Sequence, residues 1–342
     1  MAAQVRVALV QPESYRLESE WRNAGQARAY VDEAVARYGA PLVVFPEGYP
    51  GPYSGPMDSG GHLDQAPIDG LREKAREHGI YISAGHLEAN PDLSDTYFLA
   101  HKLIGPSGEV IGHYRRTHPN HPHLNAYLMG GRRHILPGEE IFVVDTDLGG
   151  IGLQVCTELF VPEISRIQML GGADILIAPA GGRYSPWRVN VGEAWEVVTR
   201  ARALENLVYV LTTQHVWQPG APAKAFAVGP EGVVAYSREP GIVYATLDLD
   251  RLDWLRSHYY DEELMSPPPD VPNFVICRAR PGQSHDRRPE LYARLVEPQP
   301  DAFDYHYAPR GLETWAEEYE RVREAPRQRR RRHGGESQEV RP

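Results

Sequence analysis

The sequence has only two cysteines, Cys156 and Cys277, among its 342 residues. Two cysteines cannot build the disulfide framework of a small secreted domain, and so low a count is typical of proteins in a reducing cytosol. The sequence contains no run of about 18 apolar residues, the length that spans a bilayer. Its first residues pass directly into a strand pattern, without the apolar segment of a secretory leader. These absences predict a cytoplasmic protein with no membrane association.

Positive charge is also scarce. The chain has 36 Lys and Arg residues against 46 Asp and Glu residues, a formal net charge of −10 at pH 7. Nucleic acids and anionic membranes bind broad cationic surfaces, so this balance argues against both as partners. With 42% hydrophobic and 24% charged residues, the composition is that of an ordinary globular protein. It leaves an enzyme, or a protein that binds a small molecule.

What the sequence does contain is an alternation of short apolar runs with helical patterns. Apolar residues recur at three- and four-residue steps over Trp21–Tyr38, which predicts a helix between the strand patterns Val5–Val10 and Leu42–Phe45. Turn-rich tetrads beginning at Gly105 and Gly229 each separate two strand patterns and predict hairpins. Strands separated by helices favour covered sheets, and hairpins require mixed pairing. We therefore expect an α/β fold, a four-layer αββα sandwich of two mixed sheets with outer helices.

The same patterns predict the other elements of the sandwich. One of them is a turn at Gly149 and Gly150 between two strands. The further strands are expected at Ile80–Ala84, Tyr97–Ile104, Val110–Tyr114, Ile141–Val144, Ile151–Val155, Ile175–Ala178, Val208–Thr212, Ala225–Val228 and Val233–Tyr236. The further helices are expected at Pro67–Gly79, Pro162–Leu170 and Trp195–Asn206.

The carboxyl-terminal part differs in composition from the rest. Residues 1–295 are predicted to form one domain, and residues 296–326 an extension. The extension contains a helix whose apolar stripe, over 312–322, predicts a face that docks on the same subunit or on another one. Residues 327–342 form a basic tail that we expect to be solvated and disordered, with nucleic-acid or membrane contact as the alternative.

Glu47 is the first of three residues whose position suggests chemistry. It lies two residues beyond the apolar strand pattern Leu42–Phe45, at the sheet edge where α/β proteins build their sites. Burial there raises the pKa of a carboxyl group and makes it a useful general base. The alternative is a helix cap or a surface acid.

Cys156 and Arg116 are the other two. Cys156 follows the strand pattern Ile151–Val155 and precedes a predicted helix, a turn in which a nucleophile can be exposed. A structural, inert cysteine is the alternative, and Cys277, inside an apolar run, fits that description better. Arg116 follows the strand pattern Val110–Tyr114 and could balance developing negative charge, or lie in a solvated basic loop.

Together these three positions resemble the Glu–Lys–Cys triad of the nitrilase superfamily, the carbon–nitrogen hydrolases. The resemblance extends in order from Val5 to Tyr292. The segments that resemble family motifs are VRVALVQPES with Asn23 in the helix after it, VVFPEGYPGPY, GPSGEVIGHYRR, IGLQVCTELFVPE, RARALENLVYV, GPEGVVAY, DLDRLDWLR and HDRRPELY.

The resemblance implies the αββα sandwich, a homodimer or larger homo-oligomer, and chemistry without a metal or an organic cofactor. By this analogy Glu47 takes the proton of Cys156, and the thiolate attacks the carbon of an amide, a carbamoyl group or a nitrile. Water or another nucleophile then releases the thioester. The residues expected to contact the substrate are Tyr53, His118, Glu158 and Phe160.

Two departures from the family pattern concern the triad. Arg116 occupies the position of the family lysine. An arginine can stabilise an oxyanion but cannot donate a proton at neutral pH. The supporting glutamate of the family has no equivalent in residues 127–138, and Glu139 and Glu140 come later in the chain.

Three histidines follow Arg116 in the same loop. We expect one of His118, His121 and His123 to line the pocket and supply the proton that an arginine cannot. A metal site formed by the three is the alternative.

The leading hypothesis is a cysteine-dependent hydrolase of non-peptide C–N bonds, acting on an amide or carbamoyl substrate. The alternatives are a nitrile hydrolase, a biosynthetic enzyme that passes the acyl group to another acceptor, and a non-catalytic homologue that binds a ligand in the same pocket. A reactive Cys156 thiol with a depressed pKa would favour an enzyme, and an inert thiol the binding protein.

Overall fold

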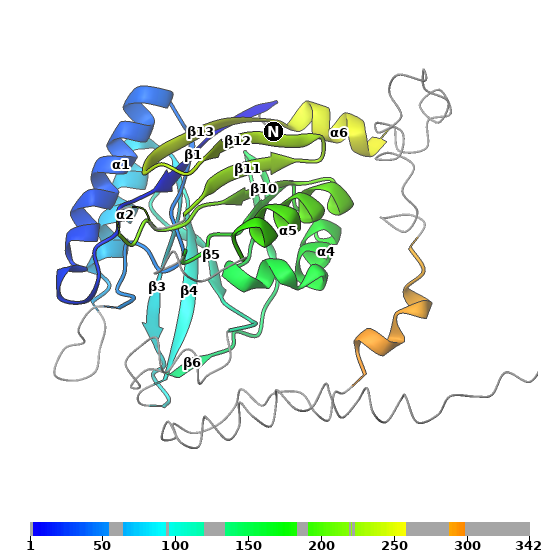
Figure 1. Cartoon of the computed structure of the whole chain (residues 1–342), viewed down its shortest axis with the longest axis horizontal. Helices are drawn as coiled ribbons and strands as arrows, with labels where there is room; N and C mark the ends of the chain where they lie inside the picture. Colours follow the sequence, from blue (N-terminus) through cyan, green and yellow to red (C-terminus); the bar gives the residue numbers. More distant parts are fainter. Residues whose placement is uncertain are drawn as a thin grey trace, which may run out of the picture.

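The computed structural model describes residues 3–54, 64–93, 96–119, 134–182, 191–218, 220, 223–257 and 287–297. These residues form two β-sheets packed face to face, with helices outside (Figure 1). The helices are α1 (Arg22–Tyr38), α2 (Ala66–His78), α4 (Pro162–Leu170), α5 (Val191–Asn206) and α6 (Leu249–Ser257). The expected αββα sandwich is confirmed.

The first sheet contains mostly strands from the amino-terminal half. They are β1 (Gln4–Gln11), β2 (Leu42–Val44), β3 (Tyr81–Ala89), β4 (Thr96–Ile104), β5 (Val110–Arg115), β6 (His134–Leu136) and β13 (Gly241–Asp248). The strand order is β13-β1-β2-β3-β4-β5, and β6 also pairs with β4. The pairs β1–β2 and β2–β3 are parallel, whereas β3–β4 and β4–β5 are antiparallel, so the sheet is mixed.

The second sheet is built from consecutive strands of the following segment. They are β7 (Val143–Thr146), β8 (Gly149–Leu153), β9 (Ile175–Ile177), β10 (Tyr209–Thr212), β11 (Ala225–Gly229) and β12 (Gly232–Ser237). They lie in the order β12-β11-β10-β9-β8-β7, with β8–β9 and β9–β10 parallel. The predicted hairpins at Gly105 and Gly229 join β4 to β5 and β11 to β12.

The hydrophobic core has three layers, one between each pair of neighbouring structural layers. Leu9 and Val44 of the first sheet meet Leu153, Ile177 and Leu211 of the second sheet in the central layer. A second cluster lies between the first sheet and the helices α1 and α2, and a third between the second sheet and α5. Both faces of each sheet are therefore buried, which explains the continuous apolar runs of β2 and β9.

Two glycines end the first two helices where the sequence pattern places the ends. Gly39 and Gly79 have φ values of 56° and 64° and cap α1 and α2 in the left-handed region. A residue with a Cβ atom is strained in this conformation, so glycine is the usual helix terminator.

Two features differ from the sequence prediction. The strands β6 and β13 and the helix α6 were not expected as elements; β13 crosses back from the second sheet to pair with β1 of the first. Gly149 and Gly150 lie inside β8 instead of forming a turn. A Cβ atom on Gly150 would lie 2.2 Å from the carbonyl oxygen of Gly172, so close backbone approach requires this glycine.

Some predictions concern residues outside the described ranges. These are the inert role of Cys277, the helix over 312–322 and the tail 327–342. The proposed domain boundaries stay predictions. No helix among the described residues has the length and apolarity needed to span a membrane.

Candidate active site

Three strand ends bring Glu47, Arg116 and Cys156 together between the two sheets. Glu47 follows β2, Arg116 follows β5 and Cys156 follows β8. The Glu47 carboxyl group is hydrogen-bonded to the Cys156 thiol. Arg116 donates from Nη1 to Glu47 Oε1 over 3.2 Å, and both of these side chains are almost completely buried. The structure therefore places the three predicted residues in one cluster, although they are far apart in the sequence.

The backbone at Cys156 has an unusual conformation. Its φ value is 57°, in the left-handed region that residues with a Cβ atom rarely adopt. Cys156 opens a 3₁₀ helix, Cys156–Phe160, and its amide donates to the carbonyl oxygen of Pro179 over 2.7 Å. Such strained positions concentrate at functional sites, where the turn presents a side chain in one direction.

Burial controls the protonation of this cluster. Burial and the neighbouring Glu47 carboxylate raise the pKa of the Cys156 thiol to about 12, against the opposing charge of Arg116. Burial also raises the pKa of Glu47, while Arg116 and hydrogen bonds from Cys156 and Gly181 act in the opposite direction. The thiol pKa is therefore raised and not depressed in the protein without substrate, because desolvation outweighs the arginine charge. Cys156 is a thiol at neutral pH, beside a carboxyl group that can accept its proton.

Arg116 connects the three loops of the cluster. Besides Glu47, its guanidinium donates from Nε to the carbonyl oxygen of His118 over 3.1 Å and from Nη2 to the hydroxyl of Thr157. Thr157 directly follows Cys156. A planar guanidinium can hold several acceptors in one geometry, which an ammonium group cannot do. Arg116 therefore fixes the position of a permanent positive charge next to the sulfur.

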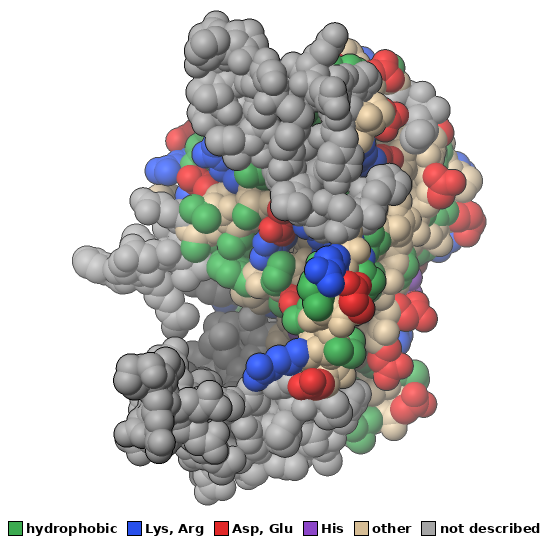
Figure 2. Space-filling view, turned by 90° about the vertical axis from the view of Figure 1, so that its right-hand side faces the viewer, with side chains coloured by type: hydrophobic (Ala, Val, Ile, Leu, Met, Phe, Trp, Pro, Cys, Tyr) green, Lys and Arg blue, Asp and Glu red, His purple; other side chains and the backbone are tan. Residues whose placement is uncertain are grey.

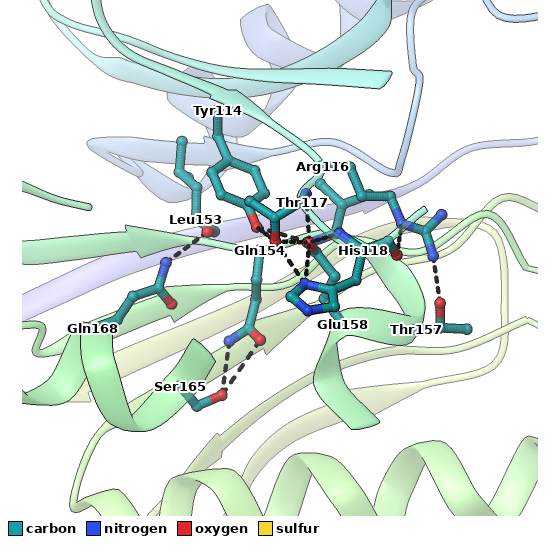
Figure 3. Close-up of polar contacts among 11 residues, drawn as sticks. Tyr114, Arg116, Thr117, His118, Leu153, Gln154, Thr157, Glu158, Ser165 and Gln168 are labelled. Carbon is teal, nitrogen blue, oxygen red and sulfur yellow. Dashed lines mark hydrogen bonds and ion pairs between the residues drawn. The ribbon is translucent and has the colours of Figure 1, made fainter. Parts of the chain in front are cut away.

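Glu158 is buried completely and binds the arginine loop to the cysteine turn (Figure 3). Its Oε1 accepts hydrogen bonds from the Tyr114 hydroxyl, from the amide and hydroxyl of Thr117, and from the His118 amide, at 2.7–2.9 Å. Its Oε2 accepts from the amide of Val155 at 2.7 Å. These contacts differ from the expected substrate contact, because both oxygens are engaged by the protein. Glu158 is placed to position the two loops.

A second set of contacts anchors the cysteine turn to α4 (Figure 3). Gln154 and Ser165 exchange hydrogen bonds of 3.1 and 3.3 Å between their side chains. Gln168 donates from Nε2 to the carbonyl oxygen of Leu153 over 2.6 Å. The residues just before Cys156 are therefore held by a helix of the outer layer.

The other predicted substrate contacts lie around this cluster. Tyr53 is buried and packs near His215 and Trp217, with ring centroids 6.5 Å apart in both pairs. Phe160 is partly exposed and meets Trp195 edge-on at 5.4 Å. The His118 side chain is about half exposed, and its Nδ1 lies 2.8 Å from the Thr117 hydroxyl. His121 and His123 lie outside the described residues.

Three residues near Glu47 were not predicted from the sequence. His215 contacts the carbonyl oxygen of Glu47, Trp217 donates to the carbonyl oxygen of Gly181, and Gly181 hydrogen-bonds the Glu47 carboxylate through its backbone. Gly181 follows β9 and His215 follows β10. The strand-end argument that selected Glu47 and Cys156 could have found them as well.

Elsewhere in the described part of the chain, three side chains lie close enough together to bind a cation, but a lysine is already paired with two of them. Asp32, Glu77 and His78 of α1 and α2 have ligand atoms within 4.8 Å of one another. The ammonium group of Lys74 lies 2.8 Å from carboxylate oxygens of Asp32 and Glu77. The two carboxylates are therefore paired with a cation of the protein itself.

The sequence of the described core matches a known family. The family model described as carbon-nitrogen hydrolase matches residues 6–256. The chain belongs to the carbon–nitrogen hydrolase family. This places it in the nitrilase superfamily that the motifs indicated, among enzymes of the amidase and nitrilase type.

Relatives and solved structures agree with this membership. The deaminated glutathione amidase of Homo sapiens is 30% identical over 280 residues, covering 77% of this carbon–nitrogen hydrolase and 77% of the relative. A carbon–nitrogen hydrolase structure from Helicobacter pylori G27 covers 80% of this chain and 98% of that one, with a TM-score of 0.63 and 22% identity.

A third similar protein is an amidase from Nesterenkonia sp. AN1. The structure of one of its glutamate mutants covers 75% of this chain and 96% of that one, with a TM-score of 0.59 and 21% identity. That structure contains a covalent acetamide adduct, formed from fluoroacetamide, at the active-site cysteine of the amidase.

Proposed function

We propose that this carbon–nitrogen hydrolase cleaves the C–N bond of a small amide, with Cys156 as nucleophile and Glu47 as general base. The observation that carries the proposal is the hydrogen bond between the Glu47 carboxyl and the Cys156 thiol, beside the buried charge of Arg116. A nucleophile in contact with a base, which is itself oriented by a third group, is the arrangement that covalent catalysis needs.

The first step is attack by sulfur on the carbonyl carbon. Because the pKa of Cys156 is raised to about 12, the thiolate does not exist in advance at neutral pH. The proton moves from Sγ to Glu47 while the S–C bond forms, and the carbonyl oxygen becomes an oxyanion. Burial raises the pKa of Glu47, and this makes the carboxylate a stronger base for that transfer.

The oxyanion is stabilised by the positive charge of Arg116. The Cys156 amide is already bonded to Pro179, so it does not serve as a donor to the oxyanion. The guanidinium contacts both Glu47 and the residue after Cys156, which puts it beside the reacting sulfur. Arg116 would replace the family lysine in this electrostatic role.

The tetrahedral intermediate then loses ammonia or an amine. The C–N bond breaks, the leaving nitrogen receives the proton held by Glu47, and an acyl thioester remains on Cys156. Water attacks the thioester, giving its proton to Glu47, and the carboxylic acid and the thiol are released. His118, about half exposed at the edge of the cluster, is a second proton carrier in this scheme.

An amide is preferred over a carbamoyl compound or a nitrile as the substrate. The support is that the human relative and the Nesterenkonia protein are both named amidases. A nitrile would use the same nucleophile through a thioimidate, and an acceptor other than water would turn the same thioester into an acyl donor. Tyr53 and Phe160 are proposed to contact the acyl part of the substrate.

A substrate panel tests the proposal. Amides, N-carbamoyl compounds and nitriles are incubated with the parent protein and with Cys156→Ala, and ammonia release is measured. We expect release from at least one amide by the parent protein and none by the variant. Release that persists in Cys156→Ala, or that occurs from nitriles alone, would contradict the proposal.

A further inference from the structure

We infer that His215 and Trp217 are positioning residues that hold the general base Glu47 through contacts separate from that of Arg116. This inference rests on the proposed function and adds two residues to it. Neither side chain belongs to the proposed triad, and both lie on the segment after β10, in the second sheet. Glu47 lies after β2, in the first sheet, so the two residues would connect the base to the opposite half of the sandwich.

The hydrogen bonds of His215 define the state of its ring. Its Nε2 lies 2.7 Å from the carbonyl oxygen of Glu47, and its Nδ1 lies 2.6 Å from the hydroxyl of Ser14. A carbonyl oxygen only accepts, so Nε2 carries the hydrogen. Burial lowers the pKa of His215 to about 3, so the ring is neutral and Nδ1 accepts the Ser14 hydroxyl. One donor and one acceptor thus fix the imidazole in a single orientation.

Trp217 contacts the Glu47 carboxylate indirectly, through Gly181. Its indole N–H donates to the carbonyl oxygen of Gly181, and Gly181 bonds the Glu47 carboxylate through its backbone. A Cβ atom at residue 181 would lie 3.0 Å from Glu47 Oε2, so a side chain at this position would crowd the carboxylate. The indole therefore holds the residue whose backbone N–H binds the carboxylate.

Ring stacking joins the two contacts into one unit. The His215 and Trp217 rings are stacked, with centroids 4.0 Å apart and planes inclined by 17°. Tyr49 meets His215 edge-on at 5.8 Å. The unit therefore holds the Glu47 backbone through His215 and the Glu47 carboxylate through Trp217 and Gly181. Misplacement of a catalytic group by about 1 Å can reduce the rate about 100-fold. Loss of either contact should therefore lower kcat.

The charged and titratable groups around the unit are on several elements. Arg16, on the loop after β1, lies over the Trp217 ring at 5.2 Å and further disfavours protonation of His215. Arg116 and Cys156 also interact with the Glu47 carboxylate, and the Glu158 charge acts on it too. Because the bond from Gly181 lowers the pKa of Glu47, weakening that bond raises this pKa further.

The experiment compares four variants with an amide substrate identified in the panel. Trp217→Phe keeps the ring stack and removes the N–H donor. His215→Ala removes the imidazole, and His215→Gln restores an amide donor toward Glu47. His86→Ala is the matched control, because His86 is also a fully buried neutral histidine but lies on the outer side of the first sheet. Measurements are kcat, KM, the pH profile of kcat/KM and the melting temperature.

We expect His215→Ala to lower kcat about 100-fold with KM nearly unchanged. His215→Gln should recover much of that loss. Trp217→Phe should move the acid limb of the kcat/KM profile to higher pH, because Glu47 then binds its proton more tightly. His86→Ala should lower the melting temperature without changing kcat or the acid limb.

Two results would overturn the inference. One is Trp217→Phe with the parent kcat and an unmoved acid limb, which can be read even where His215→Ala does not fold. The other is a folded His215→Ala whose kcat equals that of His86→Ala. Activity retained by Glu47→Gln would instead refute the proposed function itself, so the two failures are distinguishable.

Discussion

Glu47 has contacts on every side of its carboxyl group and backbone. Arg116, Cys156 and Gly181 contact the carboxylate, and His215 binds the backbone carbonyl. A carboxylate so enclosed keeps a fixed orientation, and burial raises its pKa. The base is therefore preorganised before the substrate binds.

Substitution of Glu47 tests its role as base. Its pKa is raised, so activity should fall as the pH drops through a value above that of an ordinary carboxyl group. Glu47→Gln should lower kcat about 10²- to 10⁴-fold and remove this acid limb from the kcat/KM profile. Steady-state kinetics across the pH range measure both effects. An unchanged acid limb in the variant would assign the limb to another group.

Two substitutions of Arg116 test whether its positive charge or its planar guanidinium shape is needed for activity. Arg116→Lys keeps the positive charge and should retain part of the activity, whereas Arg116→Ala should abolish turnover. Because Arg116 is buried and paired with Glu47, Arg116→Ala should also reduce the free energy of unfolding by about 3–5 kcal/mol. Kinetics and denaturant unfolding measure the two effects. Full activity in a folded Arg116→Ala would exclude the oxyanion role.

At the scale of elements, the contacts of Glu158 join the loop after β5 to the turn after β8. The side chain accepts five hydrogen bonds, and a glutamine cannot accept all of them because its amide nitrogen is a donor. A buried N–H or O–H left without an acceptor costs about 1–3 kcal/mol. Without these bonds, the loop after β5 and the turn after β8 should no longer keep a fixed position relative to each other.

Glu158→Gln is therefore expected to reduce the free energy of unfolding by about 1–3 kcal/mol and to lower kcat by more than about tenfold. Glu88→Gln is the control, since Glu88 is also bound to β5 side chains, His113 and Arg115, but on the outer face. Denaturant unfolding and kcat are measured for both. Equal losses of kcat in the two variants would mean that Glu158 has no specific effect on the site.

The elements with strong local patterns were predictable, and those fixed by distant pairing were not. The helices α1 and α4 and the hairpin β4–β5 follow from periodicity and turn residues alone. In β13 only alternate residues, such as Val243 and Leu247, face the core, and its place beside β1 depends on pairing across more than 200 residues of sequence. A single sequence does not reveal such a crossover between sheets.

In the candidate site, too, the residues marked by a local pattern were predictable, and the contacts between distant residues were not. Glu47 and Cys156 stand directly after apolar strands, and position alone selected them. The same strand-end argument could have selected His215, but not its role, which depends on Ser14 and Glu47, 201 and 168 residues away along the chain. The raised pKa of Cys156 was also not predictable, since it depends on the groups that folding places around the sulfur, the Glu47 carboxylate among them.

At the scale of the whole molecule, the outer face of α4 and α5 offers an apolar contact surface for a second copy. Ile167 and Leu170 of α4 and Val197 and Leu204 of α5 are exposed. The molecule viewed from the side of these helices shows hydrophobic side chains among charged ones (Figure 2). Exposed apolar residues of neighbouring helices are typical of protein interfaces, so this face is where we expect a second copy to bind.

We therefore expect a dimer that depends on this face. The double variant Ile167→Glu with Val197→Glu should be monomeric, because each glutamate would bury a charge in the interface. Trp21→Glu is the control, since Trp21 is also exposed but precedes α1, on the opposite side of the sandwich. Light scattering after size-exclusion chromatography measures the mass. A parent protein that is monomeric at micromolar concentration would contradict the expectation.

The most direct test of the central claim is the intact mass of the protein during turnover. The protein is mixed with its best amide substrate, quenched in acid and analysed by mass spectrometry with peptide mapping. The account predicts one acyl group per chain, located on Cys156, and no adduct in Cys156→Ala. Turnover without any adduct on Cys156, or an acyl group on another residue, would contradict it.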